Sequence, residues 1–273
     1  MTEDQGRTPF ANLDQLPPHL QELLLGALAS MATTPQIARV REVADRLLDP
    51  RPGGRLLDAG CGVGEVARAL AAAVAPGGEV VAVDASSATV AAAAARDDGS
   101  GVRYEVADVV ALPFADGTFD GVRTERVLQH VAEPDAAIAE LVRVTRPGGR
   151  VCLVDTDWES LAVDGMPADL VASMRAAFAA RDTLHHQGIG RTLRRRLVRA
   201  GLRDVVAEPV PLAFTRAGGP DRVLPMFNRD IPPEAHLVPT ELRDRWFDAV
   251  DDAVARDEFL AVLTMWVAVG TRA

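Results

Sequence analysis

Apolar and polar positions follow two different periods along the chain, and their alternation predicts an α/β fold. Short apolar runs bounded by turn-forming residues predict strands, whereas apolar residues that recur every three or four positions predict helices with one buried face. Because strands and helices alternate at short intervals, we expect a parallel sheet with right-handed crossovers and helices on both faces. The strands are predicted at residues 55–58, 80–84, 102–107, 119–125 and 150–155.

The same pattern predicts less regular structure at the two ends of the chain. Residues 1–16 are polar and unpatterned, which predicts a loosely held tail. The last apolar run, 259–270, fits either a strand or a buried helix, because its periodicity does not separate the two. Helical stretches are also predicted at 18–31, 35–48, 167–200 and 219–257, together with a strand at 203–214.

No internal repeat or low-complexity linker interrupts the chain, so we expect one domain over residues 1–273. Within it, the pattern separates N-terminal helices, a central alternating core and two later helical insertions. These parts are predicted at 1–50, at 51–156, and at 157–200 with 217–258.

Composition narrows the chemistry that this fold can carry. The hydrophobic share of 48% and the charged share of 25% are typical of a soluble folded protein. The sequence contains no lysine, so all 29 basic residues are arginine, which excludes a P-loop lysine and a Schiff-base lysine. A net charge of −10 argues against nucleic acid as the main partner, since phosphates are bound by basic surfaces.

Cysteine content and hydropathy exclude further classes of protein. Cys61 and Cys152 are far apart and belong to no Cys/His cluster, so we expect neither a disulfide framework nor a metal site. The first ten residues lack a basic segment and an apolar one, and no apolar run reaches the roughly 18 residues of a membrane span. We therefore expect a cytoplasmic protein with no membrane partner.

The strongest chemical signal is a glycine-rich turn after the first strand. The sequence LLDAGCGVGE places alternate glycines there, but Glu65 stands where a dinucleotide-binding fingerprint needs glycine. Asp58, near the end of that strand, would repel phosphates and suits a cationic ligand. Asp84 ends the next strand, where a carboxylate can accept hydrogen bonds from both hydroxyls of a ribose. The expected ligand therefore has a ribose, no phosphate and a positive charge.

Those properties match S-adenosylmethionine, and the sequence resembles the class I methyltransferases that use it. DAGCGVG resembles the first motif of that family, and VVAVDAS resembles the second. Later segments are similar to the ubiquinone-biosynthesis-type branch, and the part beyond residue 156 is weakly similar to small-molecule methyltransferases of bacterial secondary metabolism. The later motifs are ADV (107–109), LPFADGTFD (112–120), RVLQHV (126–131) and LVRVTRPGG (141–149).

The resemblance implies a doubly wound, mostly parallel, Rossmann-like sheet of seven strands with an antiparallel last strand. It also implies that the N-terminal helices and both insertions close over the site, with the insertions holding the acceptor. Asp108 would meet the adenine amino group, although an aspartate there can also form a turn. Arg41 could reach the cofactor carboxylate, although such arginines are often solvated. The predicted cofactor-binding residues are Asp58, Gly60, Gly62, Gly64, Asp84, Ala85, Asp108, Val109 and Arg41.

His130 is the candidate general base. It follows the fourth predicted strand, so it should lie at the carboxyl ends of the strands, where open α/β sheets bind ligands. Imidazole also titrates near neutral pH. The alternative is a hydrogen-bonded histidine in a loop.

Four residues are candidates for binding the acceptor. Trp158 and Glu159 come just past the end of the fifth predicted strand, and Trp158 fits either a stacking platform for an aromatic acceptor or an anchor for the lid. His185 and His186 lie in the first insertion. Neighbouring helical residues point about 100° apart and seldom bind one metal ion, so one histidine facing a pocket is the favoured interpretation.

We expect the protein to transfer a methyl group from S-adenosylmethionine to a small organic acceptor, in particular a secondary metabolite, by in-line displacement. S-adenosylhomocysteine would be the product. Two alternatives share the fold: a cofactor-binding cyclase or other non-methylating catalyst, and a cofactor-binding module that regulates a partner. We expect a monomer or a homodimer.

Overall fold

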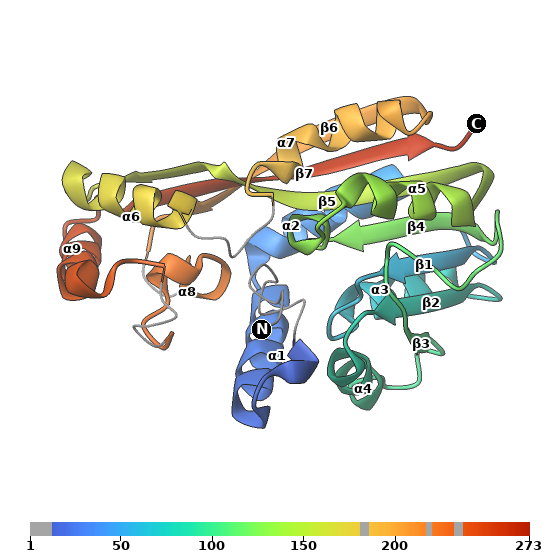
Figure 1. The fold of residues 1–273 in the computed structure, drawn as a ribbon, viewed down its shortest axis with the longest axis horizontal. Helices are drawn as coiled ribbons and strands as arrows, with labels where there is room; N and C mark the ends of the chain where they lie inside the picture. Colours follow the sequence, from blue (N-terminus) through green and yellow to red (C-terminus); the bar gives the residue numbers. More distant parts are fainter. Residues whose placement is uncertain (1–12, 181–185, 217–219, 232–236) are drawn as a thin grey trace, which may run out of the picture.

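The structure is a computed structural model, and it describes residues 13–180, 186–216, 220–231 and 237–273. Seven strands form a single sheet in the order β3-β2-β1-β4-β5-β7-β6 (Figure 1). Their bounds are β1 Arg55–Ala59, β2 Glu79–Asp84, β3 Arg103–Val106, β4 Phe119–Glu125, β5 Thr145–Asp164, β6 Arg203–Phe214 and β7 Leu260–Thr271.

Strand directions confirm the predicted fold class. The strands β1 to β5 pair in parallel, whereas β7 runs antiparallel to both β5 and β6. The last apolar run, which fitted either a strand or a helix, is the strand β7. Its residues alternate between buried and half-buried over the first half and are buried over most of the second.

Helices cover both faces of the sheet, as a doubly wound fold requires. Neighbouring residues of β1 illustrate this, because Leu56 packs into one apolar core and Leu57 into the other. The helices α2 (Pro35–Leu48) and α3 (Glu65–Val74) contribute to the first core, and α5 (Pro134–Val144) and α7 (Ile189–Arg199) contribute to the second.

The strands β5, β6 and β7 extend away from the rest of the sheet and carry a further group of helices (Figure 1). Trp246 is fully buried there and donates a hydrogen bond from Nε1 to the carbonyl of Met226 at 2.8 Å. Phe227 packs between Trp246 and Phe259, with both ring separations at 5.4 Å. These helices are α6 (Ala168–Ala180), α8 (Pro220–Val223) and α9 (Arg243–Ala255).

The helix α1 (Pro18–Ala32) stands between this group and the opposite end of the sheet (Figure 1). It contacts α8 on one side and α4 (Ser87–Ala95) on the other. None of the helices in the described ranges is both long and apolar enough to cross a membrane.

Two expectations about the chain ends and insertions are wrong. Residues 13–16 are not a loose tail: Leu13–Gln15 form a 3₁₀ helix, η1, in which Leu13 is buried. Residues 157–164 are not part of a helical insertion, because they continue β5, so Trp158 and Glu159 lie within that strand rather than past its end. The predicted helical region 167–200 contains two helices, α6 and α7.

Candidate functional site

The turn between β1 and α3 is built from glycines in the left-handed region, with φ of +79° at Gly60, +54° at Gly62 and +86° at Gly64. A Cβ at Gly60 would lie 2.2 Å from a methyl carbon of Val127, so the backbone there is packed directly against the segment after β4. Among the described residues, a Cβ at Gly62 would have one neighbour within 4 Å, namely Leu28 of α1 at 3.9 Å. Gly62 therefore exposes bare backbone to the space beneath α1, as a turn that holds a ligand requires.

Asp84 ends β2 beside this turn. Its carboxylate accepts hydrogen bonds from the backbone N–H of Gly62 at 3.0 Å and of Ser86 at 3.1 Å. Burial raises the pKa of Asp84, and the two N–H groups oppose that shift. Each carboxylate oxygen retains a further lone pair for a ligand hydroxyl. Ala85 follows directly, so the structure brings Asp84, Ala85 and Gly62 together as predicted from the sequence.

Asp14 also contributes to this side of the site, and sequence reasoning missed it. The carboxylate of Asp14 accepts hydrogen bonds from the Ser86 hydroxyl at 2.5 Å, from the Ser87 N–H at 2.8 Å and from the Ala88 N–H at 3.1 Å. These contacts cap α4 and join the N-terminal segment to the segment after Asp84. No local pattern indicates the pairing, because more than 70 residues separate the partners.

Asp58 lies in β1 beneath the glycine turn and is only 1% exposed. Its Oδ2 is buried and has no hydrogen-bond partner within the described part of the chain. Burial raises the pKa of Asp58 to about 7, against the opposing charge of Arg123. A buried carboxylate oxygen without a donor is suited to a cationic group of a ligand, such as an ammonium.

Asp108 and Val109 follow β3. Asp108 is exposed, and its Oδ1 accepts a hydrogen bond from the N–H of Val110 at 3.1 Å. That contact forms the turn that the sequence left as the alternative role for Asp108. Val109 is buried in the core. Their contacts with an adenine remain predictions.

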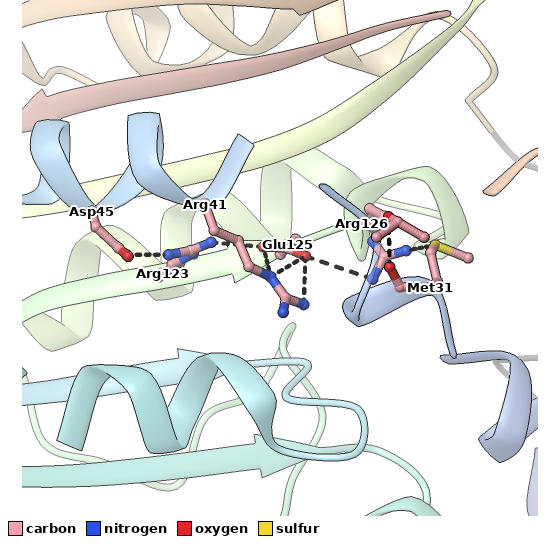
Figure 2. A network of polar contacts seen from close by, with 7 residues as sticks. Met31, Arg41, Asp45, Arg123, Glu125 and Arg126 are labelled. Atoms are coloured by element: carbon pink, nitrogen blue, oxygen red, sulfur yellow. Dashed lines mark hydrogen bonds and ion pairs between the residues drawn. The ribbon is translucent and has the colours of Figure 1, made fainter. Parts of the chain in front are cut away.

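A buried network of charged residues joins α2 to β4 (Figure 2). Glu125 accepts hydrogen bonds from Arg123 at 2.7 Å and from Arg41 at 3.1 Å, and Arg123 also reaches Asp45 at 2.6 Å. Burial alone would raise the pKa of Glu125, but Arg41, Arg123 and Arg126 outweigh it and lower the pKa to about 2. Arg41 is thus held by a partner inside the protein, and its contact with a cofactor carboxylate remains a prediction.

The segment after β4 begins at Arg126 and continues as a short 3₁₀ helix, η2 (Leu128–His130). Gln129 fixes this segment, because its N–H donates to Asp155 at 3.2 Å and its side-chain oxygen accepts from Trp158 Nε1 at 2.7 Å. His130 is half-buried at the end of η2. The structure therefore places His130 at the carboxyl end of β4 as predicted, whereas its role as a base remains a prediction.

The side chains of Trp158 and Glu159 contact different parts of the molecule. The Trp158 ring packs against Phe178 of α6 at 5.5 Å, in addition to its bond to Gln129, which are the contacts expected of a lid anchor. Glu159 is 56% exposed and pairs with Arg191 of α7 at 3.0 Å. These contacts tie Glu159 to a helix that packs on the sheet, and its contact with an acceptor remains a prediction.

Of the two candidate histidines, His186 lies within the described residues. His186 Nε2 lies 3.3 Å from the carbonyl of Ala132, which places His186 near the end of the η2 segment. His185 lies outside the described residues. Across the described ranges, no group of three or more His, Cys, Asp or Glu residues is arranged to hold a metal ion.

Comparison with known proteins places this geometry in a family. The profile of the methyltransferase domain matches residues 57–153. An uncharacterised 37.1 kDa protein of a transposon in Streptomyces fradiae is 37% identical over 245 residues, which are 89% of this chain and 69% of that protein. The ubiquinone/menaquinone biosynthesis C-methyltransferase UbiE of Burkholderia mallei is 36% identical over 115 residues, which are 41% of this chain and 47% of that protein. The match thus spans about half the length of UbiE.

Solved structures support the same fold. A phosphoethanolamine N-methyltransferase of Haemonchus contortus, in complex with S-adenosyl-L-methionine, has a TM-score of 0.62 at 18% identity. That comparison covers 96% of this chain and 59% of the other. The chain belongs to the class I S-adenosylmethionine-dependent methyltransferases, in the branch that includes UbiE, and S-adenosylmethionine is its cofactor.

Proposed function

We propose that the protein transfers a methyl group from S-adenosylmethionine to a small organic acceptor, a secondary metabolite. The observation that carries the cofactor assignment is the arrangement of Gly62, Asp84 and Asp58. The backbone of Gly62 faces the space under α1, and the Asp84 carboxylate beside it is held by backbone N–H groups. Beneath the turn, the buried Oδ2 of Asp58 has no hydrogen-bond donor within the described residues. Together they fit a ligand with a ribose and an ammonium group.

Each of these residues has a definite part in holding the cofactor. Asp84 accepts hydrogen bonds from the ribose hydroxyls, and Asp58 receives the ammonium of the amino-acid end. Asp108 meets the adenine from the end of β3. When bound, the cofactor supplies a methyl group already activated by its sulfonium. The protein therefore contributes mainly proximity and alignment, which are worth up to about 7–11 kcal/mol in well-oriented systems.

His130 acts where the acceptor must lose a proton. This role is supported by its location at the end of η2, in the same segment as Val127, which packs against Gly60. A general base of this kind accelerates a reaction by roughly 10²–10⁴-fold. In a His130→Ala variant, kcat should fall by about that factor while the affinity for S-adenosylhomocysteine stays unchanged. Near-wild-type turnover would remove His130 from the mechanism.

A small-molecule acceptor is supported by the apolar interior at the far end of β5 and β7. Trp246, Phe227 and Phe259 are buried there. The likeness to UbiE, whose name assigns it to quinone biosynthesis, supports an acceptor of the same general kind. The proposal also includes a cytoplasmic location for the protein and a monomeric or homodimeric state.

The cofactor assignment is tested with Asp84→Ala. We expect its affinity for S-adenosylhomocysteine to fall by about 1.5–3 kcal/mol in calorimetry, because hydrogen bonds to a charged group are lost. Asp98→Ala, at an exposed aspartate after α4, is the matched control and should bind as the wild type does. Equal affinity in both variants, with intact folding, would contradict the assignment.

The reaction is tested separately with labelled S-adenosylmethionine and a panel of phenols, amines and polyketide-like acceptors. Transfer of label to one class of acceptor supports methyl transfer. Tight binding of S-adenosylhomocysteine without transfer to any acceptor would instead support a cyclase or another non-methylating reaction on the same fold.

A further inference from the structure

Arg126 is an unusual cation, because it is largely buried and poorly matched by its neighbours. Its side chain is 16% exposed, and within the described ranges its buried Nε has no hydrogen-bond partner. Nη1 contacts the Met31 sulfur, which is a weak acceptor. Nη2 forms an ion pair with Glu125 at 3.6 Å, which is beyond hydrogen-bond distance (Figure 2). The guanidinium therefore donates no hydrogen bond to an oxygen acceptor within the described part of the chain.

The carboxylate nearest to Arg126 is already used by other arginines. Glu125 receives hydrogen bonds at 2.7 Å from Arg123 and at 3.1 Å from Arg41. Two further carboxyl groups, those of Asp155 and Glu65, also act on the charge of Arg126. Asp155 accepts backbone N–H bonds from Thr156 and Gln129. Burial also lowers the pKa of Arg126, with Glu125 opposing the shift, which indicates that its positive charge is incompletely compensated.

The position of Arg126 places this charge at the edge of the cofactor site. It directly follows β4, and its φ of +58° is one that side chains other than glycine rarely adopt. The next residue, Val127, packs against Gly60 of the glycine turn. Met31, from the covering helix α1, lies on the other side. Backbone strain of this kind is typical of positions that serve a ligand.

We propose that Arg126 binds a carboxylate, or a similar oxyanion, on a small molecule held in this site. A planar guanidinium with free donors binds a carboxylate through two parallel hydrogen bonds. The proposal rests on the proposed function, and it adds that the ligand beside Arg126 is anionic. Two molecules could supply the anion, namely the acceptor and the amino-acid end of the cofactor, and the experiments below separate them.

The first experiment uses sulfate as a simple oxyanion and measures Tm at constant ionic strength, adjusted with chloride. It compares the full-length wild type with Arg126→Gln, and with Arg195→Gln at an exposed arginine of α7 as the matched control. Sulfate stabilises most proteins non-specifically, and Arg126→Gln reports that background. We expect sulfate to raise the Tm of the wild type and of Arg195→Gln by about 2–4 °C more than that of Arg126→Gln. Equal shifts in all three proteins would overturn the proposal.

The same titration with bound S-adenosylhomocysteine identifies the source of the anion. If the sulfate effect persists, the pocket is free for an acidic acceptor. If S-adenosylhomocysteine abolishes the effect, the cofactor carboxylate occupies the pocket. In that case, Arg126→Gln should bind S-adenosylhomocysteine at least tenfold more weakly and should bind 5′-methylthioadenosine, which lacks the amino-acid end, as the wild type does.

The Tm of the ligand-free variants tests whether Arg126 has a purely structural role. Because Glu125 keeps two other arginines, Arg126→Gln and Arg126→Met should melt within a few degrees of the wild type, or above it. A Tm lowered by more than about 5 °C in both variants would show that folding depends on this guanidinium, and it would overturn the proposal. If the wild type fails to bind S-adenosylhomocysteine, the proposed function fails, while the sulfate titration still tests Arg126 itself.

Discussion

Two regions of the molecule differ in the side chains that they bury: one buries polar and charged residues, and the other buries aromatic ones. The cofactor region, residues 55–144, contains β1 to β4 and the glycine turn. The distal region comprises the described residues of 158–180 and 220–265. Every buried polar or charged residue in the described ranges lies between Thr34 and Asp157, and none lies in the distal region. Buried aromatic residues show the reverse distribution, since the cofactor region contains only Phe119. The distal ones are Phe178, Phe227, Trp246, Phe247 and Phe259.

Under the proposed function, the two regions would recognise the two ligands of the methyltransferase by different means. A polar cofactor requires carboxylates and backbone groups at fixed positions, and these leave a motif in the sequence. An apolar acceptor needs only a shaped apolar surface, which many sequences provide. The comparison therefore predicts that substitutions in the two regions affect different measurable properties.

The largest effect is expected in the distal region, from Trp246→Ala. This change removes a fully buried ring and its hydrogen bond to Met226, and it should lower the free energy of unfolding by about 3–5 kcal/mol. The affinity of the folded protein for S-adenosylhomocysteine should stay within about twofold of the wild type. Denaturant unfolding and calorimetry measure the two quantities. A large loss of affinity would show that the regions are not independent.

Gly60→Ala should lower both the stability of the protein and its affinity for S-adenosylhomocysteine, because Gly60 lies where the cofactor site meets the core. A Cβ there would overlap Val127, and the φ of +79° disfavours alanine. We expect a loss of about 2–4 kcal/mol in the free energy of unfolding and weaker binding of S-adenosylhomocysteine. Gly26→Ala, in α1 with no atom near its Cβ, is the matched control and should stabilise by about 0.5–1 kcal/mol. Similar stabilities for the two variants would contradict the packing described for the turn.

Asp58 should make stability and binding depend on pH in opposite directions. Its folded pKa of about 7 lies above the unfolded value, so the folded state holds the proton more tightly. The stabilising contribution is complete below about pH 4 and is lost as pH rises through 7, at about 1.4 kcal/mol for each unit of difference between the two pKa values. Above pH 7, the ionised carboxylate should bind the cofactor ammonium more strongly.

The Asp58→Asn variant isolates both effects. Its stability relative to the wild type should increase from pH 4 to pH 7, and the rise in S-adenosylhomocysteine affinity between pH 6 and pH 8 should disappear. Asp155 also has a pKa raised to about 7 by burial, but it is present in both proteins and cancels in the difference. Parallel pH profiles for the two proteins would show that Asp58 is not the titrating group.

The smallest effect is expected from Glu159→Gln. Glu159 is more than half exposed, and surface ion pairs such as that with Arg191 contribute roughly 0–1 kcal/mol. Stability and kcat/KM should therefore change little. A loss of kcat/KM beyond about tenfold at unchanged stability would show that Glu159 binds the acceptor, as the sequence had suggested.

Local sequence was sufficient for much of the fold. Helix α2 and the strands β4 and β6 have the predicted bounds. The bounds of α2 follow from apolar residues that recur on one face of the helix. The far end of β5 was missed, and residues 157–164 were assigned to a helical insertion, because polar residues there interrupt the apolar run of the strand. In the structure, Asp157 is neutralised by Arg191 at 2.5 Å and the strand is paired with β7, and neither partner is close in sequence.

In the candidate site too, contacts between residues that are distant in sequence were not predicted. Asp84 and Gly62 were predictable because a motif places them at the ends of adjacent strands, which the parallel sheet brings together. The roles of Glu125 and Asp14 were not predicted, because Arg41, which binds Glu125, and the partners of Asp14 lie more than 70 residues away and depend on how the N-terminal helices fold back. Sequence therefore defines contacts within the repeated βα units more readily than contacts made by segments outside them.

The continuity of β5 and β7 has a consequence for protein engineering. The two strands pair from Arg150 with Thr271 to Asp157 with Thr264 and, after a shift of register, from Ala162 with Val262 to Asp164 with Leu260, so one ribbon supports both regions. Transplanting the distal region from a relative would therefore divide a hydrogen-bonded ladder instead of exchanging a loop. Chimaeras that retain both strands from one parent, and exchange only the helices carried by them, are the ones expected to fold.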